Sequence, residues 1–103
     1  MKPVRITPRA ASDIDACFAW IRKDNPAAAL RLLDAIERTC DLLSRMPGIG
    51  SPRYAEISLV HGVRMLPVTG FKNYLLFYIE HEDSVDIIRV LHGARDPPEA
   101  LQS

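Results

Sequence analysis

Residues 84–96 read SVDIIRVLHGARD and hold the side chains best suited to chemistry, namely Arg89, His92, Arg95 and Asp96. A guanidinium keeps its charge at any physiological pH, so Arg89 inside an apolar run requires an acidic partner or a bound anion. Arginine stabilises the charge of a phosphate, and histidine exchanges protons near neutral pH. The segment is therefore the first candidate for a catalytic or partner-binding site.

Two interpretations of Arg89 stay open. The commoner one is an internal ion pair or an arginine that reaches the rim of a sheet. The other is an anion or partner site on the face of the sheet that no helix covers. Strand alternation places Arg89 on one face with Val85, Ile87 and Leu91. Arg64, on a neighbouring strand, is expected on the same surface.

The HGARD end of the segment is equally ambiguous. His92 is a candidate general base, or the more common strand-end histidine bonded to a backbone carbonyl. Gly93 is expected to take a positive φ that lets the chain leave the sheet. Arg95 and Asp96 pair with each other or cap the turn. These residues alone leave the chemistry open.

Hydrophobic periodicity predicts the elements that position these side chains. They are a strand at residues 4–6, helices from Pro8 to about Asn25 and from Pro26 to about Met46, and strands at 63–68, 71–80 and 84–92. The order β-α-α-β-β-β predicts an α+β domain in which a helical hairpin packs on one face of a small, mainly antiparallel sheet. Residues 47–61 are expected to form a surface loop.

Two Thr/Asn-Pro pairs mark where the helices begin. Thr7-Pro8 and Asn25-Pro26 each place a side-chain acceptor before a proline, which has no amide to leave unpaired at the first helical turn. Apolar residues then recur at helical spacing, so each helix has one apolar stripe. The stripes contain Ile14, Cys17, Phe18 and Ile21 in the first helix, and Ala29, Leu33, Ile36, Cys40 and Leu43 in the second.

The totals describe an ordinary small domain. The chain has 103 residues, and we expect one domain over residues 1–103. Thirteen Lys and Arg balance thirteen Asp and Glu, so no net charge favours nucleic acid or an anionic membrane. No apolar run approaches the length of a membrane span, and MKPVRIT does not resemble a signal peptide. These features predict a cytoplasmic protein.

The metal-ligating residue types are scattered. Cys17 and Cys40 lie far apart with no CxxC spacing, which favours two reduced thiols over a disulfide between facing helices. His61, His81 and His92 fall in a predicted loop, a turn and a strand end, with no two at ligand spacing. We therefore expect neither a metal site nor a cofactor.

The whole chain resembles the RelE/ParE superfamily of bacterial type II toxins. TPRAASDID and FAWIRKDNPAAALRLLDAIE are similar to the helical hairpin of the family, and LLSRMPGIGSPR to the loop that follows. GVRMLPVTGFKNYLLFYIEHEDSVDIIRVLHGARD is similar to its sheet. Each string is weakly specific, but their order and spacing cover nearly all of the chain.

The resemblance implies one of two activities. RelE-type toxins cleave mRNA on the ribosome, and Arg64, Arg89 and His92 would be the catalytic residues of such a nuclease. However, YAEISLVHG contains no lysine, no tyrosine follows Tyr78, and the charge is balanced. The helical hairpin and the HGARD ending resemble the ParE branch better, which implies inhibition of DNA gyrase by protein contact. An inactive member that only binds antitoxin is the third possibility.

Either branch implies a cognate ParD-like antitoxin whose C-terminal segment wraps the toxin. Its helix is expected along the helical hairpin and its extended part along the sheet. Neither a membrane nor sequence-specific DNA binding is expected of the toxin alone. The expected partner-binding residues are Arg64, Tyr74, Arg89, His92, Arg95 and Asp96 on the sheet and its end, and Ile14, Phe18, Ile21, Leu33 and Ile36 on the hairpin.

Overall fold

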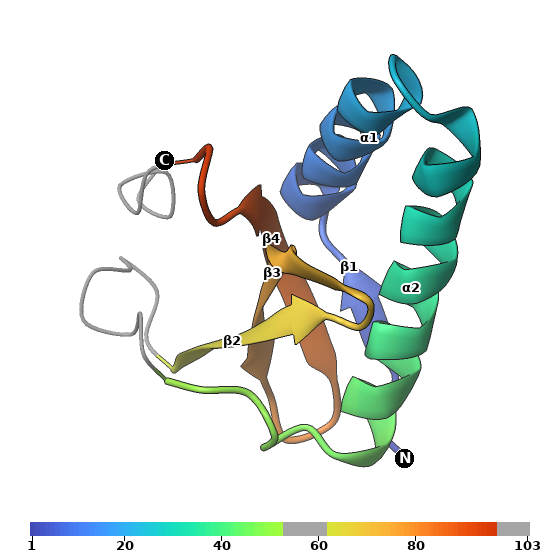
Figure 1. Cartoon of the computed structure of the whole chain (residues 1–103). Helices are drawn as coiled ribbons and strands as arrows, with labels where there is room; N and C mark the ends of the chain where they lie inside the picture. The colour runs from blue at the N-terminus through green and yellow to red at the C-terminus, as the bar shows by residue number, and fades with distance from the viewer. Residues whose placement is uncertain (53–61, 97–103) are drawn as a thin grey trace.

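The computed structural model of the chain describes residues 1–52 and 62–96 (Figure 1). The elements in chain order are β1 (Val4–Ile6), α1 (Pro8–Arg22), α2 (Pro26–Arg45), β2 (Val63–Val68), β3 (Phe71–Glu80) and β4 (Val85–His92). The predicted order β-α-α-β-β-β is confirmed, and the strand and helix bounds agree to within a few residues.

The four strands form one sheet in the order β1-β4-β3-β2. β2, β3 and β4 pair antiparallel, whereas β1 lies parallel to β4 at the edge of the sheet. The helical connection from β1 is what allows this parallel pairing, because a short turn joins only antiparallel neighbours. The expected α+β class with a mainly antiparallel sheet is confirmed.

Both helices begin at the predicted caps. The Thr7 hydroxyl accepts a hydrogen bond from the Ala10 amide at 3.3 Å, and the Asn25 side-chain oxygen accepts one from the Ala28 amide at 3.0 Å. Each cap satisfies one amide that the first helical turn leaves without a partner. The second cap restarts the chain at once, so α1 and α2 form a tight hairpin beside the sheet (Figure 1).

The sheet separates two apolar clusters. The first lies between the sheet and the hairpin and contains Ala10, Cys17, Leu32, Ala35, Ile36, Leu43, Val68, Tyr74, Leu76, Tyr78, Val85, Ile87 and Val90. The second contains Val63, Met65, Phe77 and Leu91. Both faces of β3 and β4 are therefore apolar, as expected for central strands.

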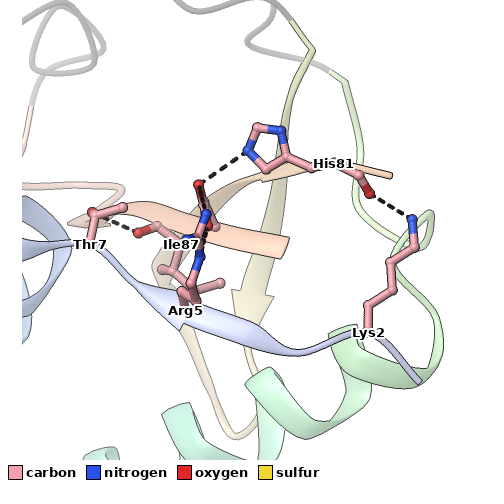
Figure 2. Close-up of polar contacts among 6 residues, drawn as sticks. Lys2, Arg5, Thr7, His81 and Ile87 are labelled. Atoms are coloured by element: carbon pink, nitrogen blue, oxygen red, sulfur yellow. Dashed lines mark hydrogen bonds and ion pairs between the residues drawn. The ribbon is translucent and has the colours of Figure 1, made fainter. Parts of the chain in front are cut away.

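Polar contacts fasten the short strand β1 to β4 (Figure 2). The Thr7 hydroxyl donates to the Ile87 carbonyl at 2.8 Å, and the Lys2 ammonium donates to the His81 carbonyl at 2.7 Å (Figure 2). The Arg5 guanidinium donates to both carboxylate oxygens of Asp86, at 2.9 and 3.1 Å. These contacts hold the start of α1 in a fixed position against β4.

Glycine supplies the positive φ of the β2–β3 turn, where Gly70 has a φ of +81°. The prediction for Gly93 is wrong, because the positive-φ glycines among the described residues are Gly62 and Gly70. Gly93 instead approaches β3 closely, where an added Cβ would lie 3.2 Å from the Leu75 side chain. Part of the predicted 47–61 loop, residues 53–61, lies outside the described residues.

Among the described residues, no helix has the length and apolarity needed to cross a membrane. Cys17 and Cys40 are both free thiols, which confirms the expectation of two reduced cysteines.

The Arg5–Asp86 contact predicts a pH dependence of stability. Hydrogen bonds from Arg5 hold the pKa of Asp86 below its ordinary value, although desolvation opposes them. The contact therefore stabilises the fold above the ordinary aspartate pKa of about 3.9 and is lost as the pH falls through the lowered value. We expect Asp86→Asn to lower the urea midpoint near neutral pH, with the difference from wild type shrinking in acid.

Asp41→Asn is the matched control, because the Asp41–Arg45 pair is exposed and lies within one helix. Urea unfolding of the three proteins across the acidic range makes the comparison. A deficit of Asp86→Asn that stays constant down to about pH 2 would contradict the assignment.

Candidate functional site

Arg89 is held by a carboxylate of α1. Its side chain is buried, at 6% exposure, and its Nε donates to Asp13 Oδ2 at 2.7 Å while Nη2 donates to Oδ1 at 3.2 Å. The Val90 amide also donates to Asp13 Oδ2, at 3.0 Å. The internal ion pair is therefore the correct interpretation of Arg89, and the acid belongs to the chain itself.

The predicted environment of Arg89 is wrong because β4 contains a β-bulge. Tyr78 pairs with Ile87 and Phe77 pairs with Arg89, so Ile88 is an extra residue in β4. An extra residue reverses the alternation of side chains beyond it. Val85 and Ile87 therefore belong to the cluster under the helices, whereas Leu91 belongs to the cluster on the other face.

Arg64 and Arg89 do not share a surface, contrary to the prediction. Arg64 stands opposite Tyr78, whose ring packs in the first cluster, whereas Arg89 stands opposite Phe77, whose ring packs in the second. The Arg64 guanidinium donates to the Gly50 carbonyl at 2.8 Å. The two arginines are therefore committed to different structural contacts and do not converge on one phosphate position.

The C-terminal turn, residues His92–Asp96, is closed by its own polar groups. His92 Nδ1 accepts hydrogen bonds from the amides of Ala94 at 3.2 Å and Arg95 at 3.0 Å. Asp96 Oδ2 accepts from the His92 amide at 2.7 Å, which confirms the expected capping role of Asp96. The expected histidine-to-carbonyl bond is replaced by two amide donors, which places the neutral-ring proton on Nε2.

Arg95 ties this turn to α1. Its guanidinium carbon lies 4.9 Å from the centre of the Trp20 ring and its Nε lies 3.7 Å from Asp96 Oδ1. Burial raises the pKa of the Cys17 thiol to about 11, and the nearby Arg95 charge opposes this shift only in part. The turn thus sits against one flank of α1, with a cavity of about 140 Å³ between them.

Burial also raises the pKa of a second thiol and of two phenols, only some of which lie near the turn. Burial, followed by the charge of Glu37, also raises the pKa of Cys40 to about 11, so both thiols stay protonated near neutral pH. Burial is the main cause that raises the pKa of Tyr74 and of Tyr78 above the ordinary phenol value. The Tyr74 ring stands edge-on to the His92 ring, with ring centres 4.9 Å apart, and the charge of the nearby Arg95 opposes the rise in the pKa of Tyr74 only in part. A phenol whose pKa is raised is a poor general base near neutral pH.

The hairpin residues proposed for partner binding differ in exposure. Ile14 and Ile21 are half-buried against the first cluster, Phe18 is half-buried, and Leu33 is 38% exposed. Ile36 is only 4% exposed and belongs to the core, so it is unavailable to a partner. The expectation for Tyr74 fails for the same reason, at 7% exposure.

Among the exposed large apolar residues of the two helices, Trp20 and Leu30 are those that the sequence pattern did not select, at 55% and 58% exposure. Both lie off the apolar stripes that mark the core-facing side of each helix. Their position on the solvent side of an amphipathic helix could have identified them from the sequence as candidate binding residues, because large apolar side chains are enriched at binding surfaces.

A buried tyrosine anchors the chain after α2. The Tyr78 hydroxyl donates to the Pro47 carbonyl at 2.8 Å and accepts from the Gly50 amide at 2.7 Å. Arg64 adds its bond to the Gly50 carbonyl, and Ser51 pairs with Met65 at the outer edge of β2. We therefore assign Tyr78 and Arg64 a structural role, in which they hold the chain that follows α2 against the sheet.

Residues 1–52 and 62–96 contain no group of three His, Cys, Asp or Glu side chains that could hold a metal ion. His61 lies outside the described residues.

Comparison with known proteins gives consistent matches. A family model described as "ParE toxin of type II toxin-antitoxin system, parDE" matches residues 4–97. The chain is 29% identical to toxin Y4kP of Sinorhizobium fredii over 100 residues, covering 97% of each protein. It is 30% identical to toxin RelE3 of Caulobacter vibrioides over 94 residues, covering 90% of this chain and 96% of that protein.

The fold matches a solved structure described as a chromosomal ParDE toxin–antitoxin system from P. aeruginosa. The TM-score is 0.72 at 24% sequence identity, covering 89% of this chain and 96% of the other. At this identity the match supports the shared fold, including the helical hairpin and the mixed sheet.

The Asp13–Arg89 contact predicts a large loss of stability on removal of the carboxylate charge. Asp13→Asn deprives a buried guanidinium of its acidic partner, so we expect the free energy of unfolding to fall by about 3 kcal/mol. Asp15→Asn, at an exposed position two residues along α1, should change it by less than about 0.5 kcal/mol. Urea unfolding followed by circular dichroism measures both, and equal effects would contradict the assignment.

The Tyr78 anchor predicts that Gly50 does not tolerate a side chain. A Cβ at Gly50 would overlap the Tyr78 ring, lying 2.6 Å from Cε1, whereas a Cβ at Gly48 would have no atom within 4 Å. We expect Gly50→Ala to destabilise the fold by about 1–3 kcal/mol, because overpacking a buried contact displaces its neighbours. Gly48→Ala is the matched control. If the two variants have the same thermal unfolding midpoint, Tyr78 does not anchor the loop at Gly50.

Proposed function

The chain belongs to the ParE toxin family of type II toxin–antitoxin systems, and from this premise we propose that it inhibits DNA gyrase by protein contact rather than by catalysis. The C-terminal turn carries this proposal. The amides of His92, Ala94 and Arg95 are bonded within the turn and that of Gly93 is bonded to β3, while the Arg95 side chain is 32% exposed. A preformed polar turn with an accessible arginine suits recognition of a protein surface, because little ordering entropy is lost on binding.

A cognate antitoxin is the second partner that we propose. The exposed apolar residues Trp20, Leu30 and Leu33 lie on the hairpin and suit an amphipathic helix. Arg89, which was expected to bind a partner, is left out of the proposed antitoxin contact, because the Asp13 carboxylate already pairs with its guanidinium. The surface of the hairpin, rather than the buried face of the sheet, is therefore the proposed contact.

The ribonuclease alternative has one observation in its favour, the relative named toxin RelE3. Phosphodiester cleavage would require Arg64, Arg89 and His92 to converge on one phosphate. The two arginines stand opposite residues of different sheet faces, and His92 Nδ1 already accepts two amide bonds. This geometry disfavours the nuclease.

The test is inhibition of gyrase supercoiling by purified, antitoxin-free protein, together with the accumulation of cleaved DNA. We expect inhibition by the wild type and at least a tenfold weaker effect of Arg95→Glu, since charge reversal opposes a complementary contact by more than about 1.4 kcal/mol. Arg45→Glu is the matched control, because Arg45 is an exposed arginine at the end of α2.

Two outcomes would overturn the proposal. Cleavage of mRNA on ribosomes by a preparation that leaves gyrase active would identify a RelE-type nuclease. Absence of both activities, with no growth arrest when the protein is expressed alone, would identify a member that only binds antitoxin.

A further inference from the structure

Trp20 is the only tryptophan of the chain and lies on α1 with 55% of its surface exposed. Two cations lie near its ring. The Arg95 guanidinium carbon is 4.9 Å from the ring centre and the Lys23 ammonium is 5.4 Å away. An indole ring attracts cations through the negative charge above its face, and tryptophan does so more strongly than the other aromatic residues.

The two cations have different consequences for the fold. Lys23 follows α1 directly, so its contact with Trp20 is local in sequence and does not connect α1 to another element. Arg95 belongs to the C-terminal turn, so its contact joins α1 to a segment that is distant in sequence. Of the two cations, only Arg95 can therefore help to orient the turn relative to the helix.

Contacts with β3 hold the start of the turn but do not join it to α1. The Gly93 amide donates to the Asn73 carbonyl at 2.7 Å, and the Tyr74 ring lies edge-on to the His92 ring with ring centres 4.9 Å apart. A cavity of about 140 Å³ separates α1 from the end of β4 and the turn, and Cys17, Arg89, Arg95 and Asp96 contribute to its wall. The contacts within the turn, from Asp96 and from His92 Nδ1, fix its shape but not its direction. The ion pair between Arg95 and Asp96 is also internal to the turn.

We propose that Trp20 is a positioning residue that clasps Arg95 and so fixes the orientation of the C-terminal turn relative to α1. The inference rests on the proposed function, in which this turn contacts gyrase. It makes a residue of the helical hairpin necessary for target binding without any contact of its own with the target. Trp20 acts through Arg95, and its effect disappears when Arg95 is absent.

A double-mutant cycle on gyrase inhibition tests this dependence. Trp20→Leu keeps an apolar side chain but removes the ring, and Arg95→Gln keeps a polar side chain but removes the charge. We expect each substitution to weaken inhibition by about fivefold, the ratio that corresponds to an exposed cation–π contact, and the double variant to be no weaker than Arg95→Gln alone. Trp20→Phe should recover part of the loss, because it restores an aromatic face.

Lys23→Gln is the matched control, since it removes the other cation from the same ring and should leave inhibition unchanged. Urea unfolding midpoints of all variants show whether weaker inhibition comes from loss of the Trp20–Arg95 contact or from unfolding of the protein. The proposal is overturned if Trp20→Leu inhibits gyrase as well as the wild type does, or if Lys23→Gln weakens inhibition as much as Trp20→Leu. It is also overturned if the double variant is weaker than Arg95→Gln by the full factor that Trp20→Leu causes alone.

A target-free measurement separates this proposal from the proposed function. In the NMR spectrum of the free protein, the Arg95 side-chain protons should be displaced by the ring current of Trp20, and Trp20→Leu should abolish the displacement. Random-coil shifts of these protons would overturn the clasp even if the toxin inhibits gyrase. A wild-type protein that shows the displacement but leaves gyrase active would overturn the proposed function alone.

Discussion

The bonds that the Asp13 carboxylate accepts from Arg89 and from the Val90 amide are the interactions on which the join between α1 and the end of β4 depends. β3 pairs with one edge of β4 as far as His92, but β1 ends at Ile6, so the opposite edge of β4 has no strand beside it beyond Ile87. Asp13 replaces the missing strand by accepting the Val90 amide, and the same carboxylate neutralises Arg89. The Asp13 side chain thus accepts a hydrogen bond from a strand edge that has no neighbouring strand and also neutralises a buried charge. An unpaired strand edge and an unpaired buried charge are both unfavourable.

This arrangement limits what the rest of the surface can do. Because Arg89 serves the join between α1 and β4, and Arg64 serves the loop after α2, the sheet offers no cluster of free arginines in the described residues. The polar C-terminal turn and the exposed apolar side chains of the hairpin remain for recognition. These features support the proposed action by protein contact and the proposed binding of an antitoxin.

Most of the fold was predictable because its signals are local. Thr7-Pro8 and Asn25-Pro26 mark helix starts by capping chemistry, and the alternating strands give their own bounds. The bulge at Ile88 was not predictable, because its residues fit a regular strand equally well, and it reversed the face of Leu91. The pairing of Asp13 with Arg89 joins residues 76 positions apart, and neither residue carries a local signal of the other.

Amide hydrogen exchange in the free protein tests the role of Asp13 most directly. If Asp13 ties the free edge of β4 to α1, the Val90 amide exchanges as slowly as the amides in the middle of β4 that pair with β3. Asp13→Asn then accelerates exchange at Val90, measured where the variant is still folded. Fast exchange at Val90 in the wild type, or slow exchange that Asp13→Asn leaves unchanged, would contradict the account.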